Sequence, residues 1–108
     1  MTVVYLRLFA EVSADRATTI AAAVRDILVT TGARVRVASV TPYWKIPEYQ
    51  EILLELQVDA EPAEGVSSSA SALGTAWTWQ SPTEAMWNAG DGHEFCERTV
   101  RWAHLESP

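Results

Sequence analysis

The sequence predicts an α+β fold in which an antiparallel sheet carries two helices on one face. Two patterns support this prediction: apolar residues alternate with polar ones in several short segments, and they recur at helical spacing in two longer ones. The segments follow one another as strand, helix, strand, strand, helix, strand, with a short element and one more strand at the end. A chain of 108 residues has the size of one domain, so we expect residues 1–108 to share a single core.

Residues 3–10 form the first predicted strand. Alternation divides its side chains between two faces, with Val4, Leu6 and Leu8 on one and Tyr5, Arg7 and Phe9 on the other. A helix follows, with Ser13 or Asp15 as the cap at its start and Gly32 as the left-handed residue that ends it. Its apolar stripe consists of Ala17, Ile20, Ala21, Val24, Ile27 and Leu28.

Residues 34–40 and 51–59 are the next two predicted strands. Both alternate, and in the second one Glu51, Glu55 and Gln57 face water together with Leu53. Residues 41–49 contain two prolines, which cannot donate to a strand ladder, so this segment is predicted to be a loop or the twisted tip of a hairpin.

A second helix is predicted from Pro62 to Leu73, with Gly74 as its stop. Residues 75–80 are the fourth predicted strand, with Trp77 and Trp79 on the same face. Residues 84–89 are too short to classify, and residues 99–106 form a last strand after the turn at 90–92.

The first six elements match the ferredoxin-like βαββαβ arrangement, extended by a C-terminal hairpin or strand. Right-handed crossovers would place both helices on one face of the sheet. We expect the other face to be amphipathic, since it would carry Tyr5, Phe9 and Leu53 among polar residues. Such a surface suits a contact with a partner or a lined pocket.

The formal net charge of −6 argues against nucleic acid as a partner, because an acidic surface repels phosphates, and it would suit a basic protein. One cysteine cannot form an internal disulfide. Arg7 and Glu11 interrupt the apolar run that a signal peptide needs, and no segment has the length of a membrane span. We therefore expect a cytoplasmic protein that does not bind a membrane.

The segment from Tyr43 to Ile46 is the first candidate site. Large apolar side chains at a hairpin tip lack neighbours that would bury them, and the flanking prolines lower the cost of ordering the loop. The predicted partner-binding residues are Tyr43, Trp44 and Ile46 as anchors and Glu48, Glu51 and Glu55 as a charged rim. In the alternative interpretation, Trp44 folds back over the sheet edge and closes the core.

Four of the five tryptophans lie in the last third of the chain. They form either an aromatic core that seals the C-terminal elements or the wall of a pocket for a flat ligand. We favour the core, because no converging charged or hydrogen-bonding group can be assigned to such a pocket.

His93 and Cys96 fit one pair of zinc ligands, but a second pair is absent and His104 stands alone on a strand. Glu94 and Glu97 flank Cys96 and would raise its pKa, which disfavours a nucleophilic thiol. We therefore predict no metal, no cofactor and no catalytic residue, and we favour a protein without enzymatic activity.

The C-terminal stretch from Trp87 and Asn88 through Phe95 to Val100–Glu106 (VRWAHLE) resembles the ends of small acidic actinobacterial proteins. Some of these are similar to immunity proteins of bacterial toxin systems. The resemblance implies a stoichiometric inhibitor whose acidic, aromatic surface plugs the active site of a basic toxin, and it assigns no role to any single residue.

Ferredoxin-like chains of this length also resemble the dimeric α+β barrel family, in which two sheets pack face to face. This resemblance implies a homodimer with a pocket in each subunit, as in cofactor-free monooxygenases and isomerases that act on aromatic substrates. Tyr5, Trp77, Trp79 and His104 would then line this pocket, with His104 as the acid or base. A protein-binding module of immunity or inhibitor type is our first hypothesis, and this barrel is the second.

Overall fold

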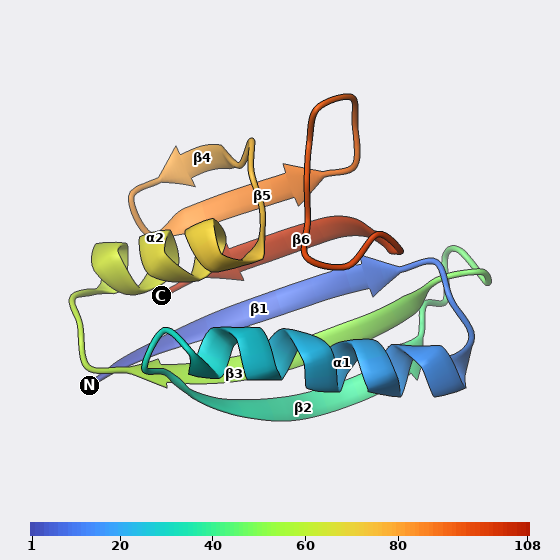
Figure 1. Cartoon of the computed structure of the whole chain (residues 1–108), viewed down its shortest axis with the longest axis horizontal. Helices are drawn as coiled ribbons and strands as arrows, with labels where there is room; N and C mark the ends of the chain where they lie inside the picture. The colour runs from blue at the N-terminus through green and yellow to red at the C-terminus, as the bar shows by residue number, and fades with distance from the viewer.

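The computed structural model describes residues 1–108 and confirms an α+β fold with two helices and a six-stranded antiparallel sheet (Figure 1). The elements are β1 (Thr2–Ala10), α1 (Ala14–Val29), β2 (Arg34–Pro42), β3 (Gln50–Val58), α2 (Pro62–Leu73), β4 (Thr78–Ser81), β5 (Glu84–Asn88) and β6 (Val100–Glu106). The strand order is β2-β3-β1-β6-β5-β4. Both helices cover the same face of the sheet, which leaves the opposite face without a covering layer.

The ends of the helices follow from local chemistry. The Ser13 hydroxyl accepts a hydrogen bond from the backbone N–H of Arg16 at the start of α1, and Gly32 has a φ of 93° just beyond its end. In α2, Pro62 occupies the first turn, where its missing N–H leaves no bond unmade. Gly74 ends this helix in an extended conformation.

The C-terminal part of the sheet differs from the expected arrangement. The strand beside β1 is β6, whereas residues 75–80, which we expected to form the fourth strand, contribute only the short edge strand β4. Residues 84–88, which could not be classified from the sequence, form β5, and β5 lies between β6 and β4 in the sheet. Val100, Ala103 and Leu105 give β6 a fully apolar inner face, while all four residues of β4 are exposed, which explains why β6 takes the inner position.

The core lies between the sheet and the two helices. The inner faces of the neighbouring strands β1 and β3 supply Val4, Leu6, Leu8, Ile52, Leu54 and Leu56, and the helices supply Ile20, Val24, Leu28, Val66 and Leu73. Each of these side chains is at most 1% exposed. Neither helix is long and apolar enough to cross a membrane.

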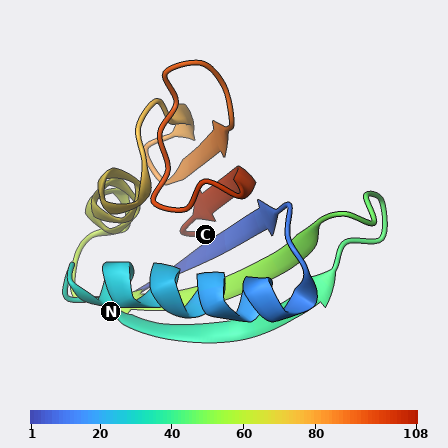
Figure 2. The same cartoon turned by 45° about the vertical axis from the view of Figure 1, so that its right-hand side comes forward.

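The loop between β5 and β6 docks beside the C-terminal end of α2 (Figure 2). Backbone hydrogen bonds join Cys96 to Leu73 at 2.7 Å and Thr75 to Glu94 at 2.8 Å. The indole of Trp87 is buried here, 4.8 Å from the ring of Phe95, and donates to the backbone oxygen of Thr75. This loop therefore extends the layer that covers the sheet.

Candidate binding face

We call the sheet face opposite the helices the open face. Cross-strand pairing arranges its side chains in three rows. The first row contains Arg36, Glu55, Tyr5, Glu106 and Glu84, the second Ser39, Leu53, Arg7, His104 and Met86, and the third Thr41, Glu51, Phe9, Trp102 and Asn88. The face is thus amphipathic, with charged, aromatic and aliphatic side chains side by side.

A continuous line of rings crosses one end of the open face. Tyr43 lies 4.3 Å from Phe9 between ring centroids, Phe9 lies 5.0 Å from Trp102, and Trp102 lies 5.8 Å from His104. The guanidinium of Arg7 sits over the Phe9 ring at 5.1 Å. The contacts fix the aromatic side chains, so the face offers a preformed surface.

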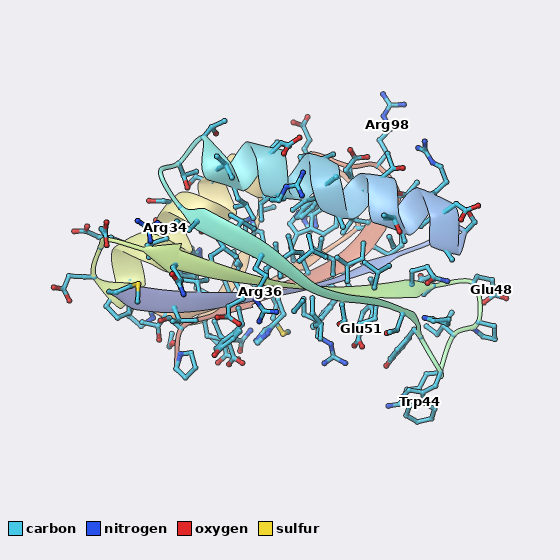
Figure 3. All side chains as sticks on the ribbon, turned by 90° about the horizontal axis from the view of Figure 1, so that it is seen from below. Arg34, Arg36, Trp44, Glu48, Glu51 and Arg98 are labelled. Atoms are coloured by element: carbon cyan, nitrogen blue, oxygen red, sulfur yellow. The ribbon has the colours of Figure 1, made fainter.

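Trp44 extends beyond this line at the tip of the β2–β3 hairpin and is 81% exposed. Figure 3 shows it projecting from the side of the sheet opposite α1. Tyr43 is half-buried against Phe9, and Ile46 is 38% exposed. The loop is closed by backbone hydrogen bonds from Tyr43 to Tyr49 and from Tyr49 to Ile46. Trp44 therefore lies in solvent and does not fold back over the sheet edge.

The three glutamates of the expected rim have different surroundings. Glu48 is exposed in the hairpin loop (Figure 3). Glu51 accepts a hydrogen bond from Nε of Arg7 at 2.6 Å, and Glu55 forms an ion pair with Arg36 at 2.7 Å. Of these three glutamates, only Glu48 has no cationic partner within the chain. The negative charges of Glu51 and Glu55 are largely balanced by Arg7 and Arg36.

A hollow of about 360 Å³ opens on the open face. Tyr5 and His104, both expected in a pocket, line it together with Arg7, Leu53, Glu55 and Glu106. Trp77 and Trp79 do not line it. Trp77 precedes β4 and packs against Phe95 at 6.2 Å, while Trp79 is 45% exposed on the edge strand.

The C-terminal tryptophans therefore divide between several environments. Trp77 and Trp87 belong to the layer over the helical side, where each indole N–H donates to a backbone oxygen, of Gly74 and Thr75 respectively. Trp102 lies on the open face in the line of rings. The C-terminal tryptophans therefore form neither a single aromatic core nor a single pocket wall. Side chains along a strand alternate between the two faces of the sheet, and this alternation separates the tryptophans.

His93 and Cys96 are not poised for chemistry. The Nδ1 atom of His93 lies 2.8 Å from the backbone oxygen of Asn88. Burial, with a further contribution from the charge of Glu97, raises the pKa of the Cys96 thiol from 9.0 to about 11. A thiol that remains protonated at neutral pH is a poor nucleophile and a poor metal ligand.

The sequence suggested that His104 stands alone on its strand, but in the structure it has close neighbours. Its Nε2 atom lies 2.8 Å from a carboxylate oxygen of Glu84, and Glu106 completes a cluster of three. The spacing His104-x-Glu106 on a strand was visible in the sequence and places both residues on one face. Glu84 could not be identified from the sequence as a member of this cluster, because its position beside His104 depends on the pairing of β5 with β6.

Comparisons of the chain with protein-family models, curated proteins and solved structures found no match. The candidate site therefore rests on its own geometry: a preformed aromatic face, an exposed tryptophan beside it, and a hollow bordered by a histidine and carboxylates.

Proposed function

We propose that the protein is a non-catalytic protein-binding module of immunity or inhibitor type, which engages its partner with the β2–β3 hairpin tip and the adjoining open face. The exposure of Trp44 carries this proposal. Tryptophan is the residue type most enriched among side chains that dominate binding energy, and leaving one in water is unfavourable unless a partner covers it.

The surroundings of Trp44 support a defined binding surface. The ring of Tyr43 lies 6.4 Å from that of Trp44 and itself packs against Phe9 at 4.3 Å between ring centroids, so the hairpin is anchored to the sheet. Lys45 lies over the Trp44 ring at 5.1 Å, and Glu48 is exposed nearby. A partner would bury Trp44 in an apolar pocket and meet the polar residues at its rim.

The partner proposed here is a basic protein. The net charge of the chain is −6, and its long-range field would accelerate association with a positively charged surface. Glu48 would contribute most among the expected rim residues, because Glu51 and Glu55 already pair with Arg7 and Arg36. The proposal places the protein in the cytoplasm, where a lone cysteine stays reduced.

The sheet supports a ferredoxin-like interpretation with an insertion. The neighbouring strands β2-β3-β1-β6, with α1 and α2 between strands along the chain, support this interpretation. The β4–β5 hairpin would then be inserted before the last strand and extend the sheet at one edge.

Affinity capture from the native host tests the binding function. Wild-type protein should retain a basic protein, and the purified pair should bind directly, whereas Trp44→Ala should lose it. Val29→Ala is the matched control, since Val29 is 50% exposed at the end of α1 on the helical side. Equal capture by wild type and Trp44→Ala would contradict the proposal.

The hollow favours a second candidate function, a small-molecule site in a dimeric α+β barrel. Tyr5 and His104 line the hollow, and a second copy packed on the open face would close it. His104 would serve as the acid or base for an aromatic substrate. Light scattering over a concentration series should then show a dimer, and quinones or phenols should quench tryptophan fluorescence. A monomer with no quenching would remove this candidate.

A further inference from the structure

The β5–β6 end of the open face brings three metal-ligating side chains together. His104 and Glu106 point to the same side because they are two residues apart on β6. Glu84 lies directly across from Glu106 on β5. The ligand atoms of the three side chains all lie within 4.8 Å of one another. Backbone pairing between two adjacent strands thus holds three donors in one cluster.

The charge of this cluster is not balanced. Two glutamates directly opposite each other on paired strands repel. Elsewhere on the open face the carboxylates have arginine partners, since Glu51 pairs with Arg7 and Glu55 with Arg36. The Glu84 carboxylate has only the imidazole of His104 as a partner, and the Glu106 carboxylate has neither a hydrogen bond nor an ion pair. A bound cation would supply the missing positive charge.

His104 is held in a fixed orientation. Its ring stacks on Trp102 with an interplanar angle of 8°, and its side chain is 18% exposed. A ring already immobilised by packing loses little conformational freedom when it binds an ion. The mixed set of one imidazole and two carboxylates distinguishes this cluster from a purely acidic surface patch, because imidazole is a preferred ligand of transition metals.

The cluster also borders a space for further ligands. His104 and Glu106 line the hollow of about 360 Å³ described above. Three protein ligands with an open fourth position are the arrangement typical of zinc sites that bind water or a small molecule. An ion held by the cluster would therefore lie at the edge of this hollow, beside two of its three ligands.

We propose that Glu84, His104 and Glu106 bind one divalent transition-metal ion, for which zinc is the best match. Zinc takes nitrogen and carboxylate ligands at about 2.0–2.2 Å, so the ligand atoms of a tetrahedral site lie about 3.3 Å from one another. The three side chains must adjust to this spacing, and the glutamates have rotatable bonds for such an adjustment. The 2.8 Å contact between His104 and Glu84 would be exchanged for bonds to the ion. The argument for zinc binding does not rest on the function proposed for Trp44.

Calorimetric titration of metal-free protein with zinc chloride tests the proposal. We expect one zinc ion per chain, with magnesium chloride unable to compete. Glu84→Gln, Glu106→Gln and His104→Gln should each weaken zinc binding at least about tenfold. In the two glutamate variants, glutamine keeps the size of the side chain and removes its charge. In His104→Gln, it removes the imidazole.

Two matched controls make the titration specific. His93→Gln removes the other histidine of the chain, whose Nδ1 contacts Asn88. Glu64→Gln removes an exposed carboxylate in the first turn of α2, on the opposite side of the sheet. Both variants should bind zinc as the wild type does.

Thermal unfolding separates loss of the site from loss of the fold. Without metal, Glu106→Gln should melt at or above the wild-type temperature, because it removes a repelling charge. Zinc should raise the wild-type midpoint and leave that of Glu106→Gln unchanged. Wild-type protein without saturable zinc binding, a Glu106→Gln variant with wild-type affinity, or loss of binding in His93→Gln would each overturn the proposal.

Discussion

The two faces of the sheet are made by the same strands, yet they differ in what surrounds each side chain. On the helix-covered face, Leu6 and Leu54 are each 1% exposed. On the open face, the neighbouring Tyr5 is 45% exposed and Leu53 is half-buried. One residue along a strand therefore separates a core position from a surface position. Stability is therefore concentrated on the helix-covered face, while the open face is free to carry binding residues.

The largest expected difference is between two tryptophans. Trp87 is 3% exposed and its indole N–H donates to Thr75, so Trp87→Ala should lower the free energy of unfolding by about 3–5 kcal/mol. Trp44→Ala should change it by less than about 0.5 kcal/mol, because the side chain is in solvent. Urea denaturation measures both. Similar losses in the two variants would mean that Trp44 belongs to the core.

Adjacent leucines of β3 provide the second comparison. Leu54→Ala leaves a cavity under the helices and should cost about 2–5 kcal/mol of unfolding free energy. Leu53→Ala removes a half-buried side chain from the open face and should cost less than about 1.5 kcal/mol. The same denaturation experiment checks the pair, and the ranking would be reversed if the helices covered the other face.

Gly74 tests how tightly the β5–β6 loop is docked. A Cβ atom at this position would collide with the backbone oxygen of Glu94 and approach the Phe95 ring to 3.0 Å. We expect Gly74→Ala to lower the unfolding free energy by about 1–3 kcal/mol and to weaken the near-ultraviolet circular dichroism of the packed tryptophans. Unchanged stability and spectrum would show that the loop is not packed as described.

The smallest effect concerns Cys96. Because burial raises its pKa from 9.0 to about 11, the folded protein holds the thiol proton more tightly than the unfolded chain. This contribution to stability is complete below pH 9 and is lost as pH rises toward 11. The rate of alkylation by iodoacetamide at pH 8 should be much lower in native protein than in urea. Equal rates in the two states would contradict the raised pKa.

Local patterns predicted much of the fold. The helical stripe from Ala17 to Leu28 and the boundaries Pro62 and Leu73 of α2 follow from periodicity, a proline and a glycine, which act over a few residues. The position of β6 beside β1 did not follow, because strand neighbours are chosen by packing over the whole sheet. From the order of elements along the chain alone, residues 75–80 were expected to lie beside β1.

The candidate site was predictable only in part, for the same reason. The prolines and aromatic residues around Trp44 indicated an exposed hairpin tip from the sequence alone, and the structure places Trp44 in solvent. The partnership of His104 with Glu84 depends on the β5–β6 register, which no local pattern encodes. Likewise, the pairing of Glu51 with Arg7 requires the register of β1 with β3.

Photo-crosslinking from position 44 would show whether Trp44 contacts a protein partner. A benzophenone amino acid in place of Trp44 should give, in the native host, an adduct with another, basic protein, whereas the same group in place of Val29 should not. Adducts formed equally from both positions, or no adduct from position 44, would contradict the assignment of partner binding to the hairpin tip and the open face. An adduct of twice the 11.9 kDa chain mass would instead identify a second copy of this protein as the occupant.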